Sequence, residues 1–530
     1  MGREICMNNT NEKKIYRFIE QFVKIFAILI LALLGGLSFF FQSRVSMDKQ
    51  TMEKVTFHNN SAFVYLFLVC IIVLLILIRN RIKQLSPKSI YSVFVIVFVF
   101  FGIILALGVG TDLRADALEI YKSVKAFSSG DFSALEKGNY VYHYPYQLGM
   151  ITYEWIMLKF VNNIEILFFA NLVFVLLNNY MLGQISGLLF NSQLVQNITL
   201  ILSFLFLPQF FFIVFAYGTI PGFSMLLLAF YCQLRFLKEH RGKFLVLFII
   251  FSCISCMLKN NYLIGILAAS ALFVFYTLKE RKIRFILYII VTLSLVLLSG
   301  KILNWSYENI SGKEVSGGEP KILWIAMGLR DESDKLGGWY DRYNWNTYEE
   351  ANYDEKTADF EAKKSIKNSI NRFANNPGYA FDFFQDKIES TWCDPLFQSI
   401  WSGPLEDCGQ NLNDQSLKRI YSEGTIHKLI RDYCSALLIL IYIATFIFVI
   451  MVFKEKNIGE LLTGIIFLIG GFIFHLFWET KSQYVYPYVF MLIPYSSYTI
   501  VRILNKSNFI MGKRRRKDDE TSSLYSDTVL

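Results

Sequence analysis

Long apolar runs separated by short polar stretches dominate this chain. Twelve of them reach or approach the roughly 17–25 residues that a helix needs to cross a bilayer. The runs are continuous rather than alternating, which excludes a transmembrane β-barrel. The pattern therefore predicts an all-α polytopic membrane protein with about twelve transmembrane helices. The predicted spans are 25–41, 62–79, 90–110, 165–190, 198–217, 219–237, 244–259, 262–278, 285–303, 435–453, 459–478 and 484–503.

Two longer polar segments interrupt the apolar runs, at 111–164 and 304–434. The second is long enough to form a small domain, which we expect to be mainly helical. We expect the chain to begin with an N-terminal transmembrane hairpin (1–89) and a transmembrane module (90–303) that contains the first outer loop (111–164). An extracytoplasmic domain (304–434) and C-terminal transmembrane helices (435–505) follow. The chain then ends in a tail (506–530) that is basic and then disordered.

The distribution of Lys and Arg predicts the orientation of the chain. Hydrophobic residues make up 54% of the sequence, and the formal net charge is +9. If every apolar run crosses the membrane, the basic residues concentrate in connections on one side of it. An excess of Lys and Arg marks that side as cytoplasmic. We expect a multi-pass cell-membrane protein with both termini in the cytoplasm. Cys393 and Cys408 fall in the second polar segment, and a disulfide between them is left open.

The first polar segment opens with "GTDLRADALEI", which carries Asp112 and Asp116. The stretch "DLRADALEIYKSVKAF" predicts an amphipathic helix along the membrane surface, with both carboxylates on one face. The simpler alternative is a solvated helix face with Asp112 near the helix start, where the dipole favours an anion. For Asp116, deeper in the expected helix, the dipole explanation is weaker.

The motif "YVYHYPYQLG" follows, with His143, Tyr144 and Gln147 at the start of an apolar run of about sixteen residues. That run is too short to cross a bilayer comfortably, so it predicts a re-entrant or interfacial helix. Tyr and His suit a boundary between polar and apolar surroundings. An ordinary aromatic belt is the alternative explanation.

Two lysines fall on the side that disfavours cations, Lys259 in "CMLKNNYLIG" and Lys481 in "FHLFWETKSQYVYPYVF". Ionisable groups at membrane depth are costly and usually serve a function. The alternative for Lys481 is a snorkelling side chain paired with Glu479.

The second polar segment predicts two helices. The stretch "YEEANYDEKTADFEAKKSIKNSINRFANNPG" indicates one helix that ends at Asn-Pro-Gly. The stretch "YAFDFFQDKIESTW" spaces its aromatic residues as a helix does. It lies either on the membrane surface or in the core of the domain.

Four stretches within 90–505 resemble the GT-C superfamily of integral membrane glycosyltransferases. The resemblance is nearest to the Gram-positive enzymes that decorate cell-wall polymers, and protein O-mannosyltransferases are more distant. The stretches are "RADALEIYKSVKAFSSGDF", "YVYHYPYQLG", "NPGYAFDFFQDKIESTWCDPLFQSIWSGP" and "WETKSQYVYPYVFMLIPYSS". The resemblance implies a GT-C fold and inverting transfer from a polyprenyl-phosphate sugar to an extracytoplasmic acceptor, a cell-wall polysaccharide or teichoic acid. The Asp loop follows the third predicted span here, whereas in the family it usually follows the first.

The resemblance also implies roles for particular residues. Asp116 matches the catalytic base, with Asp112 as a helper, and Lys481 and Lys259 would bind the donor phosphate. The candidates for substrate binding are His143, Tyr144, Gln147, Glu479, Gln483, Trp392, Gln398 and Trp401. No cofactor is required by this chemistry, and a divalent metal ion held near 112–119 is left open. The expected partners are the bilayer, the lipid-linked sugar and a glycan acceptor, and no nucleic acid.

Two alternatives stay open on the sequence. A lipid-linked saccharide flippase would use the same cations and apolar groove without a base, although no internal repeat is visible. A polysaccharide polymerase or ligase would act on a pyrophosphate-linked donor. The chain has no glycine-rich phosphate loop, which argues against direct use of a nucleotide sugar.

Overall fold

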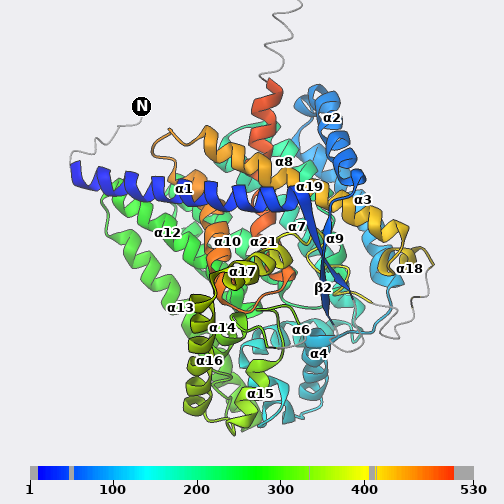
Figure 1. Cartoon of the computed structure of the whole chain (residues 1–530), viewed down its shortest axis with the longest axis vertical. Coiled ribbons are helices and arrows are strands. Elements are labelled where there is room, and N and C mark those ends of the chain that lie inside the picture. The colour runs from blue at the N-terminus through cyan, green and yellow to red at the C-terminus, as the bar shows by residue number, and fades with distance from the viewer. Residues whose placement is uncertain (1–9, 47–52, 333–334, 405–411, 413–414, 506–530) are drawn as a thin grey trace, which may run out of the picture.

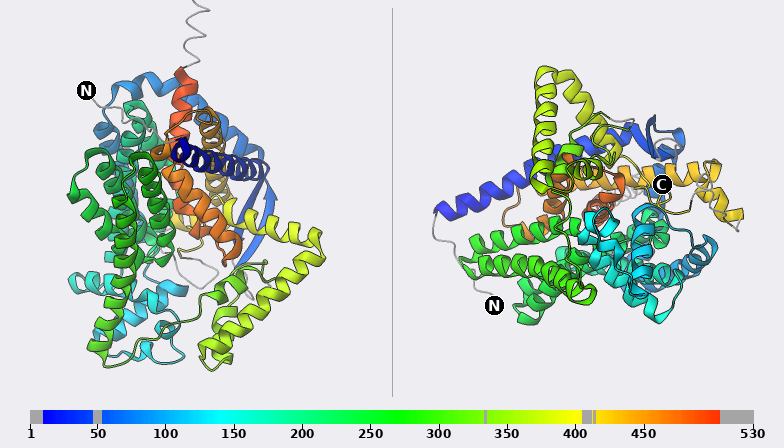
Figure 2. Two further views of the ribbon diagram at one scale, coloured as in Figure 1. Left: turned by 90° about the vertical axis from the view of Figure 1, so that its left-hand side faces the viewer. Right: turned by 90° about the horizontal axis from the view of Figure 1, so that it is seen from below.

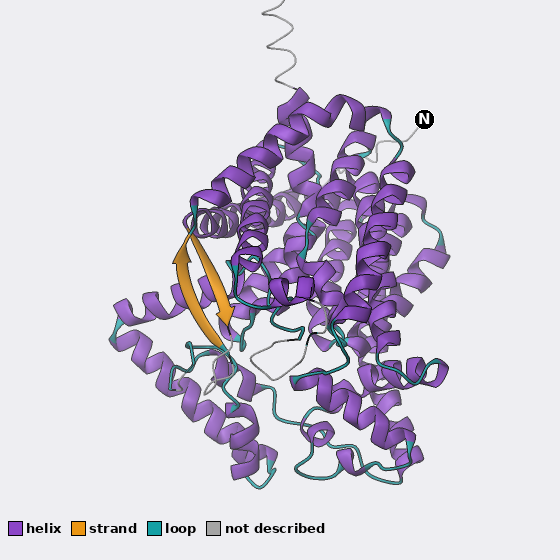
Figure 3. Ribbon diagram, turned by 90° about the vertical axis from the view of Figure 1, so that its right-hand side faces the viewer, coloured by secondary structure: helices purple, strands orange, loops and turns teal. Residues whose placement is uncertain are grey.

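The computed structural model describes residues 10–46, 53–332, 335–404, 412 and 415–505 (Figure 1). Within these residues the protein consists of helices and one two-stranded sheet (Figure 3). The predicted all-α class is therefore confirmed. Cys408 and the tail from 506 lie outside the described residues, so the predicted disulfide and the disordered tail stay predictions.

Nine of the described helices are long and apolar enough to cross a membrane, which makes this a multi-pass membrane protein. They include α1 (Thr10–Phe40), α2 (Ala62–Gln84), α3 (Pro87–Gly108), α7 (Glu165–Phe190), α10 (Thr219–Glu239), α12 (Leu263–Glu280), α13 (Arg284–Ser311), α19 (Thr425–Met451) and α20 (Thr463–Phe477). The other three predicted spans also fall on helical chain. They coincide with a bent pair at 193–214, with α11 (Gly242–Leu258) and with the broken helix that starts at α21 (Tyr486–Phe490) and continues to 505. The total of twelve stays a prediction.

The bent pair shows how the membrane module tolerates a break. Helix α8 (Gln193–Leu205) meets α9 (Pro208–Phe211) and the short turn η3 (Phe212–Val214) at 51°. Proline cannot continue the backbone hydrogen bonding of the preceding turn. Two buried side-chain amides bind carbonyls on either side of the bend: Gln209 donates to Ser203 O before it, and Asn171 donates to Ile213 O (3.1 Å) and Phe215 O (3.0 Å) after it. In an apolar environment, side chains must supply the hydrogen bonds that the backbone cannot make for itself.

Large apolar side chains point away from the protein on three of the long helices. On α3, Val93 is 61% exposed and Ile96 is 71% exposed. Similar residues line the outer faces of α2 and α13, for example Leu77 and Leu297. An exposed apolar surface of this extent fits contact with lipid chains.

Most helices of the two polar segments gather at one end of the helical module, the lower end in Figure 1, which we name the polar end. Figure 2 shows the same arrangement from two other sides. The first polar segment forms α4 (Ala115–Ser128), η1 (Ser133–Leu135), α5 (Tyr140–His143), η2 (Pro145–Gln147) and α6 (Leu148–Phe160). The second forms α14 (Ile322–Gly328), α15 (Tyr343–Glu350), α16 (Glu355–Asn375), α17 (Pro377–Trp392) and α18 (Gln415–Tyr421). The short helix expected after "YVYHYPYQLG" is α6.

One predicted helix of the second segment is in fact two. Helix α15 ends at Glu350, and α16 starts after Asp354, whose carboxylate caps it by accepting from the Thr357 amide at 2.8 Å. The predicted end at Asn-Pro-Gly is confirmed, because α16 stops at Asn375. In α17, Phe383 and Trp392 are 5% and 2% exposed, which supports core packing over a surface-lying helix.

A short hairpin connects α1 to α2. Strands β1 (Phe41–Ser46) and β2 (Lys54–Asn59) pair antiparallel, and no strand was expected in this region (Figure 3). The Ser43 amide donates to Cys393 O at 3.1 Å, so the hairpin is tied to the end of α17.

The second polar segment is fixed to the helical module through the connection after α20. The Glu479 amide donates to Trp324 O (3.0 Å), and the Thr480 amide donates to Gly338 O (3.0 Å). Gly328 permits this contact, because a Cβ there would lie 2.3 Å from Phe477 O. Lys387, 1% exposed on α17, closes the junction. Its ammonium donates to Gly328 O, to Leu476 O at 3.0 Å and to Trp478 O at 2.9 Å.

We expect Lys387→Met to loosen this junction. The variant leaves three carbonyls without their charged donor, a loss of about 2 kcal/mol or more. Hydrogen exchange measured by mass spectrometry should become faster in α17 and in 476–480. Lys363→Met is the matched control, since Lys363 forms only an exposed pair with Asp359 on α16. Unchanged protection in Lys387→Met would contradict the role of this lysine.

Candidate functional site

Asp116 lies in the first turn of α4. The helix buries Ala117, Ile120 and Val124 and packs on α6, which leaves Asp116 on the opposite, exposed side. A carboxylate in the first turn is stabilised by the helix dipole. Helix α4 begins at Ala115, later than the sequence predicted. Asp116 and not Asp112 therefore lies at the helix start, where the dipole favours an anion.

Asp112 precedes the helix, so the prediction that both carboxylates share one helix face is wrong. The chain before α4 is held extended at Arg114. The Arg114 guanidinium donates to Trp401 O and to Gly403 O (3.2 Å), and it stacks over the Trp401 ring at 4.5 Å. This anchorage prevents a helical turn between the two aspartates. Asp112 lines a small separate pocket together with Ser402.

Lys259 lies in the turn between α11 and α12. Its ammonium donates to Thr219 Oγ1 at 2.8 Å and lies over the rings of Tyr217 (4.8 Å) and Tyr484 (5.5 Å). Gly218 allows this turn to approach α10, because a Cβ there would lie 2.0 Å from Leu258 O. Burial lowers the pKa of Lys259 to about 7, although the charges of Asp116 and Glu479 oppose the shift.

Lys481 forms an ion pair with Glu53 at 2.8 Å. The other Glu53 oxygen accepts from Trp339 Nε1 at 2.9 Å. Burial raises the pKa of Glu53, but the charge and hydrogen bond of Lys481 outweigh burial, and the net shift is downward. Burial likewise lowers the pKa of Lys481, and the charges of Glu53 and Glu479 reverse the shift to a net rise. The sequence left open an ion pair between Lys481 and Glu479. In the structure, Lys481 instead forms its ion pair with Glu53.

The charges of Lys481 and Lys259 both act on Asp116, so the three groups lie near one another, and we name the region that they surround the central recess. The carboxylate is exposed to solvent, and yet burial is the main reason that the pKa of Asp116 is raised. Both statements hold for a group that protein atoms surround without covering it from solvent. The charges of Lys481 and Lys259 and the hydroxyl of Tyr140 oppose this rise.

Glu479 forms another side of the central recess. It is 2% exposed, and Tyr484 donates to its Oε1 at 3.3 Å. Burial raises the pKa of Glu479 to about 7 against the charge of Lys481.

Gln147 joins a cluster of tyrosines beside Asp116. Its amide donates to Tyr217 OH (2.8 Å) and Tyr140 OH (3.4 Å). Tyr146 is 44% exposed. Burial raises the pKa of Tyr146 above its ordinary value, and the charge of Asp116 raises it further. The recess thus offers phenol and amide groups next to the charged residues.

His143 and Tyr144 lie at the junction with the second polar segment. His143 Nδ1 is 2.7 Å from Glu319, and its ring stacks on Trp345 with 3.5 Å between centroids. Asn344 donates to the other Glu319 oxygen (2.7 Å) and to Tyr144 OH (3.1 Å). Both candidates therefore bind the first polar segment to the second.

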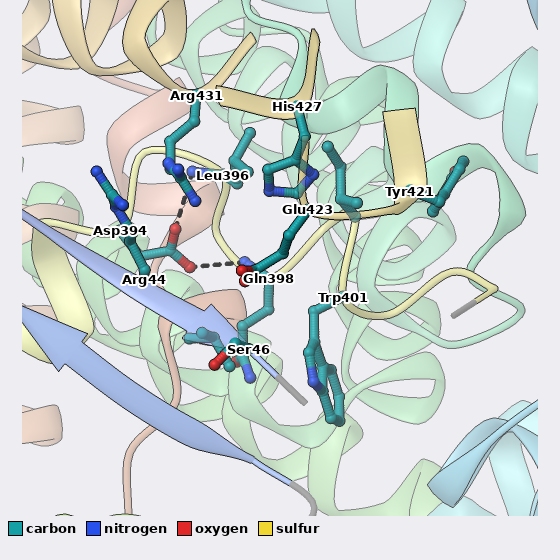
Figure 4. Close-up of a pocket in the computed structure, with 12 residues that line it drawn as sticks. Arg44, Ser46, Asp394, Leu396, Gln398, Trp401, Tyr421, Glu423, His427 and Arg431 are labelled. Atoms are coloured by element: carbon teal, nitrogen blue, oxygen red, sulfur yellow. Dashed lines mark hydrogen bonds between the residues drawn. The ribbon is translucent and has the colours of Figure 1, made fainter. Parts of the chain in front are cut away.

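The remaining candidates fall into two groups. Trp392 packs on Phe472 and Tyr488 inside the protein. Gln398 and Trp401 line a second cavity beside the central recess (Figure 4). The backbone amide of Gln483 donates to Gln398 Oε1 at 3.4 Å, so Gln483 contacts the wall of this cavity.

The structure adds residues that the sequence did not indicate. Glu53, Trp339 and Tyr340 reach Lys481 from the hairpin and from the second polar segment. Lys387 is buried at the junction. Glu53 lies on a predicted outer connection, but the sequence held no pattern that set it apart from other surface charges.

The arrangement combines three functions in one recess. Asp116 can accept a proton, because it is solvent-accessible and only partly compensated by the lysines. Lys259 and Lys481 can stabilise an anion that develops nearby. The tyrosines and Gln147 can hydrogen-bond and stack on a polar ring.

No protein-family model matches the chain, and no curated protein matches it either. Among the residues that the structure describes, no group of three or more His, Cys, Asp and Glu side chains is placed to hold a metal ion.

The lowered pKa of Lys259 gives a prediction that needs no substrate. At pH 8 a lysine with a pKa of about 7 is mostly the uncharged, nucleophilic amine, whereas an ordinary lysine is almost all ammonium. We expect Lys259 to be reductively methylated with a midpoint near pH 7. Lys481, whose pKa is raised, should react only at much higher pH. Mass spectrometry after short pulses at each pH measures both rates.

The same experiment tests the proximity of Asp116. The Asp116 charge raises the pKa of Lys259, so Asp116→Asn should move the labelling midpoint of Lys259 to lower pH. Glu119→Gln, on the exposed side of α4, is the control and should leave it unchanged. Equal midpoints for Lys259 and Lys481 would show that the central recess is assembled differently.

Proposed function

We propose that this protein is a membrane glycosyltransferase of GT-C type, with about twelve spans and its central recess on the extracytoplasmic side. It transfers a sugar from a polyprenyl-phosphate sugar to a glycan or cell-wall polymer. The observation that carries the proposal is the convergence of Asp116, Lys259 and Lys481, from three distant segments, in one recess at the end of an apolar module. The resemblance of four stretches to GT-C enzymes supports it.

The proposed chemistry is a single displacement at the anomeric carbon. Asp116 accepts the proton of the acceptor hydroxyl as that oxygen bonds to the anomeric carbon. The bond from the anomeric carbon to the phosphate oxygen breaks on the opposite face, and its electron pair leaves with the polyprenyl phosphate. The configuration at the anomeric carbon inverts.

The leaving phosphate needs positive charge nearby. Lys259 supplies part of it while protonated, and its pKa of about 7 makes that charge sensitive to a neighbouring anion. An anion beside it favours the protonated form. Lys481 remains charged, because Glu53 holds it. The two lysines therefore differ: one is a fixed cation, and the other gains charge as phosphate forms.

The surroundings suit the two ends of the donor. The tyrosines and Gln147 beside Asp116 offer stacking and hydrogen bonds to a sugar. The exposed apolar faces of the long helices offer a path for a polyprenyl chain from the bilayer. These features support a lipid-linked donor over a water-soluble one.

We expect Asp116→Asn to lower the transfer rate at least about 100-fold, because the amide cannot accept the proton. The assay uses the full chain in lipid nanodiscs with a radiolabelled polyprenyl-phosphate sugar and wall polymer. Glu119→Gln is the matched control on the same helix and should keep the wild-type rate.

Two outcomes would contradict the proposal. Transfer by Asp116→Asn at the wild-type rate would remove the base. Movement of labelled lipid across vesicles by the wild type, without any transfer, would identify a flippase. Deletion of the gene, followed by sugar analysis of the wall polymers, then identifies donor and acceptor by what is lost.

A further inference from the structure

A second cavity of about 210 Å³ lies beside the central recess. Figure 4 shows its walls, which come from β1, from the chain at 394–401 and from α18 and α19 with the turn between them. The residues that matter are Arg44, Gln398, Trp401, Tyr421, Glu423 and Arg431. We name it the arginine cavity.

The arginine cavity contains buried hydrogen-bond donors without acceptors. Five polar atoms of its walls are buried and have no hydrogen-bond partner: Arg44 Nε, Gln398 Nε2, Trp401 Nε1, Tyr421 OH and Arg431 Nε. Gln398, Tyr421 and Arg431 are 1%, 3% and 7% exposed as whole residues. Unmade hydrogen bonds of buried donors are costly, and so many in one cavity point to a ligand rich in acceptors.

The acidic groups of the cavity do not neutralise the arginines by contact. Asp394 accepts from the Leu396 amide (3.0 Å), the Gln398 amide (2.8 Å) and Ser482 Oγ (2.6 Å), so its oxygens are already engaged. Glu423 is exposed at the edge. Asp432 also acts on both arginines, but its oxygens accept from Gln42 Nε2 (3.4 Å) and Ser61 Oγ (2.7 Å). The Nε–H groups of Arg44 and Arg431 therefore remain available to a ligand.

Trp401 lines the arginine cavity and also contacts residues outside it. Lys481 lies over its ring at 5.8 Å, and Arg114 lies over it at 4.5 Å. Ser482, next to Lys481, donates to Asp394 of the cavity wall. A ligand that fills the arginine cavity would thus lie close to Lys481, because Ser482, the next residue along the chain, is bonded to the cavity wall.

We propose that the arginine cavity binds a phosphate group carried by the acceptor, and that it positions the acceptor hydroxyl for Asp116. Phosphate brings four oxygens to five donors, and the planar fork of arginine matches its geometry. The identity of the acceptor rests on the proposed function, but the phosphate site does not. The phosphate comes either from a soluble phosphodiester polymer or from a lipid-anchored phosphate. Candidate spans α1, α2 and α19 all end beside this cavity, so both sources can reach it.

Binding can be measured without any transfer reaction. The full chain in phosphatidylcholine nanodiscs is titrated by calorimetry with glycerophosphoglycerol as the soluble source and with polyprenyl phosphate as the lipid source. Glycerol and polyprenol are the neutral controls, and acetate is the carboxylate control. We expect at least one phosphate probe to bind, and none of the controls.

Arginine variants locate the site. Arg44→Gln or Arg431→Gln should weaken phosphate binding about tenfold or more, as the loss of a charged hydrogen bond implies. The lysine variants at the same positions keep the charge and should bind with intermediate affinity. Arg419→Gln, an exposed arginine of α18, makes the same charge change outside the cavity and should have no effect. A thermal unfolding midpoint for each variant checks that it is folded.

The proposal is overturned if both phosphate probes bind the glutamine variants as tightly as the wild type, or if acetate binds and phosphate does not. Arginine dependence with glycerophosphoglycerol identifies the polymer. Arginine dependence with polyprenyl phosphate alone identifies the lipid source and, because that lipid is the leaving group of the proposed reaction, overturns the acceptor role of the cavity. Asp116→Asn should still bind the probe. If that variant also transfers sugar normally, the proposed function fails while the phosphate site stands.

Discussion

Mutual compensation of buried charges holds the polar end together. Asp116, Glu53, Glu479, Lys259 and Lys481 act on one another in the central recess, and they come from four distant parts of the chain, since Glu479 and Lys481 share one turn. A buried charge is costly without a partner, so none of these segments can place its ionisable group there alone. The loop after α3, the hairpin, the turn after α11 and the turn after α20 therefore assemble as a unit.

The apolar module makes this compensation necessary. A helix in lipid satisfies its own backbone, and polar groups that the helix cannot serve accumulate where helices end or break. Gln209 donates to a carbonyl just before α9, Asn171 donates to a carbonyl that follows η3, and Lys387 serves the carbonyls at the end of α20. The closest approaches occur at Gly218 and Gly328, where any side chain would collide with backbone. Side-chain donors and missing side chains thus fix the turns that carry Lys259 and Lys481.

The two cavities then form a connected pair in our proposals. The central recess holds the proton acceptor and the cations for a leaving phosphate, and the arginine cavity, which Trp401 lines, holds the acceptor. Such an arrangement orients two large substrates before reaction, which is how positioning contributes to rate. The bond from Ser482 to Asp394 links the walls of both, so the position of Lys481 depends on the second cavity as well as on Glu53.

Hydrophobic periodicity by itself determined the helical membrane class and the positions of the long helices, because a lipid-crossing helix is set by local composition. It also drew attention to Asp112, Asp116, Lys259 and Lys481, since ionisable groups stand out beside apolar runs, and the preference for Asp116 over Asp112 came from the family resemblance. The start of α4 depends on Arg114 binding the carbonyls of Trp401 and Gly403, almost 290 residues away, and no local pattern records that contact. Glu53, Lys387 and the pair of Arg44 and Arg431 are ordinary surface charges in the sequence. Only the tertiary structure encloses them, because the segments that surround them meet solely after folding.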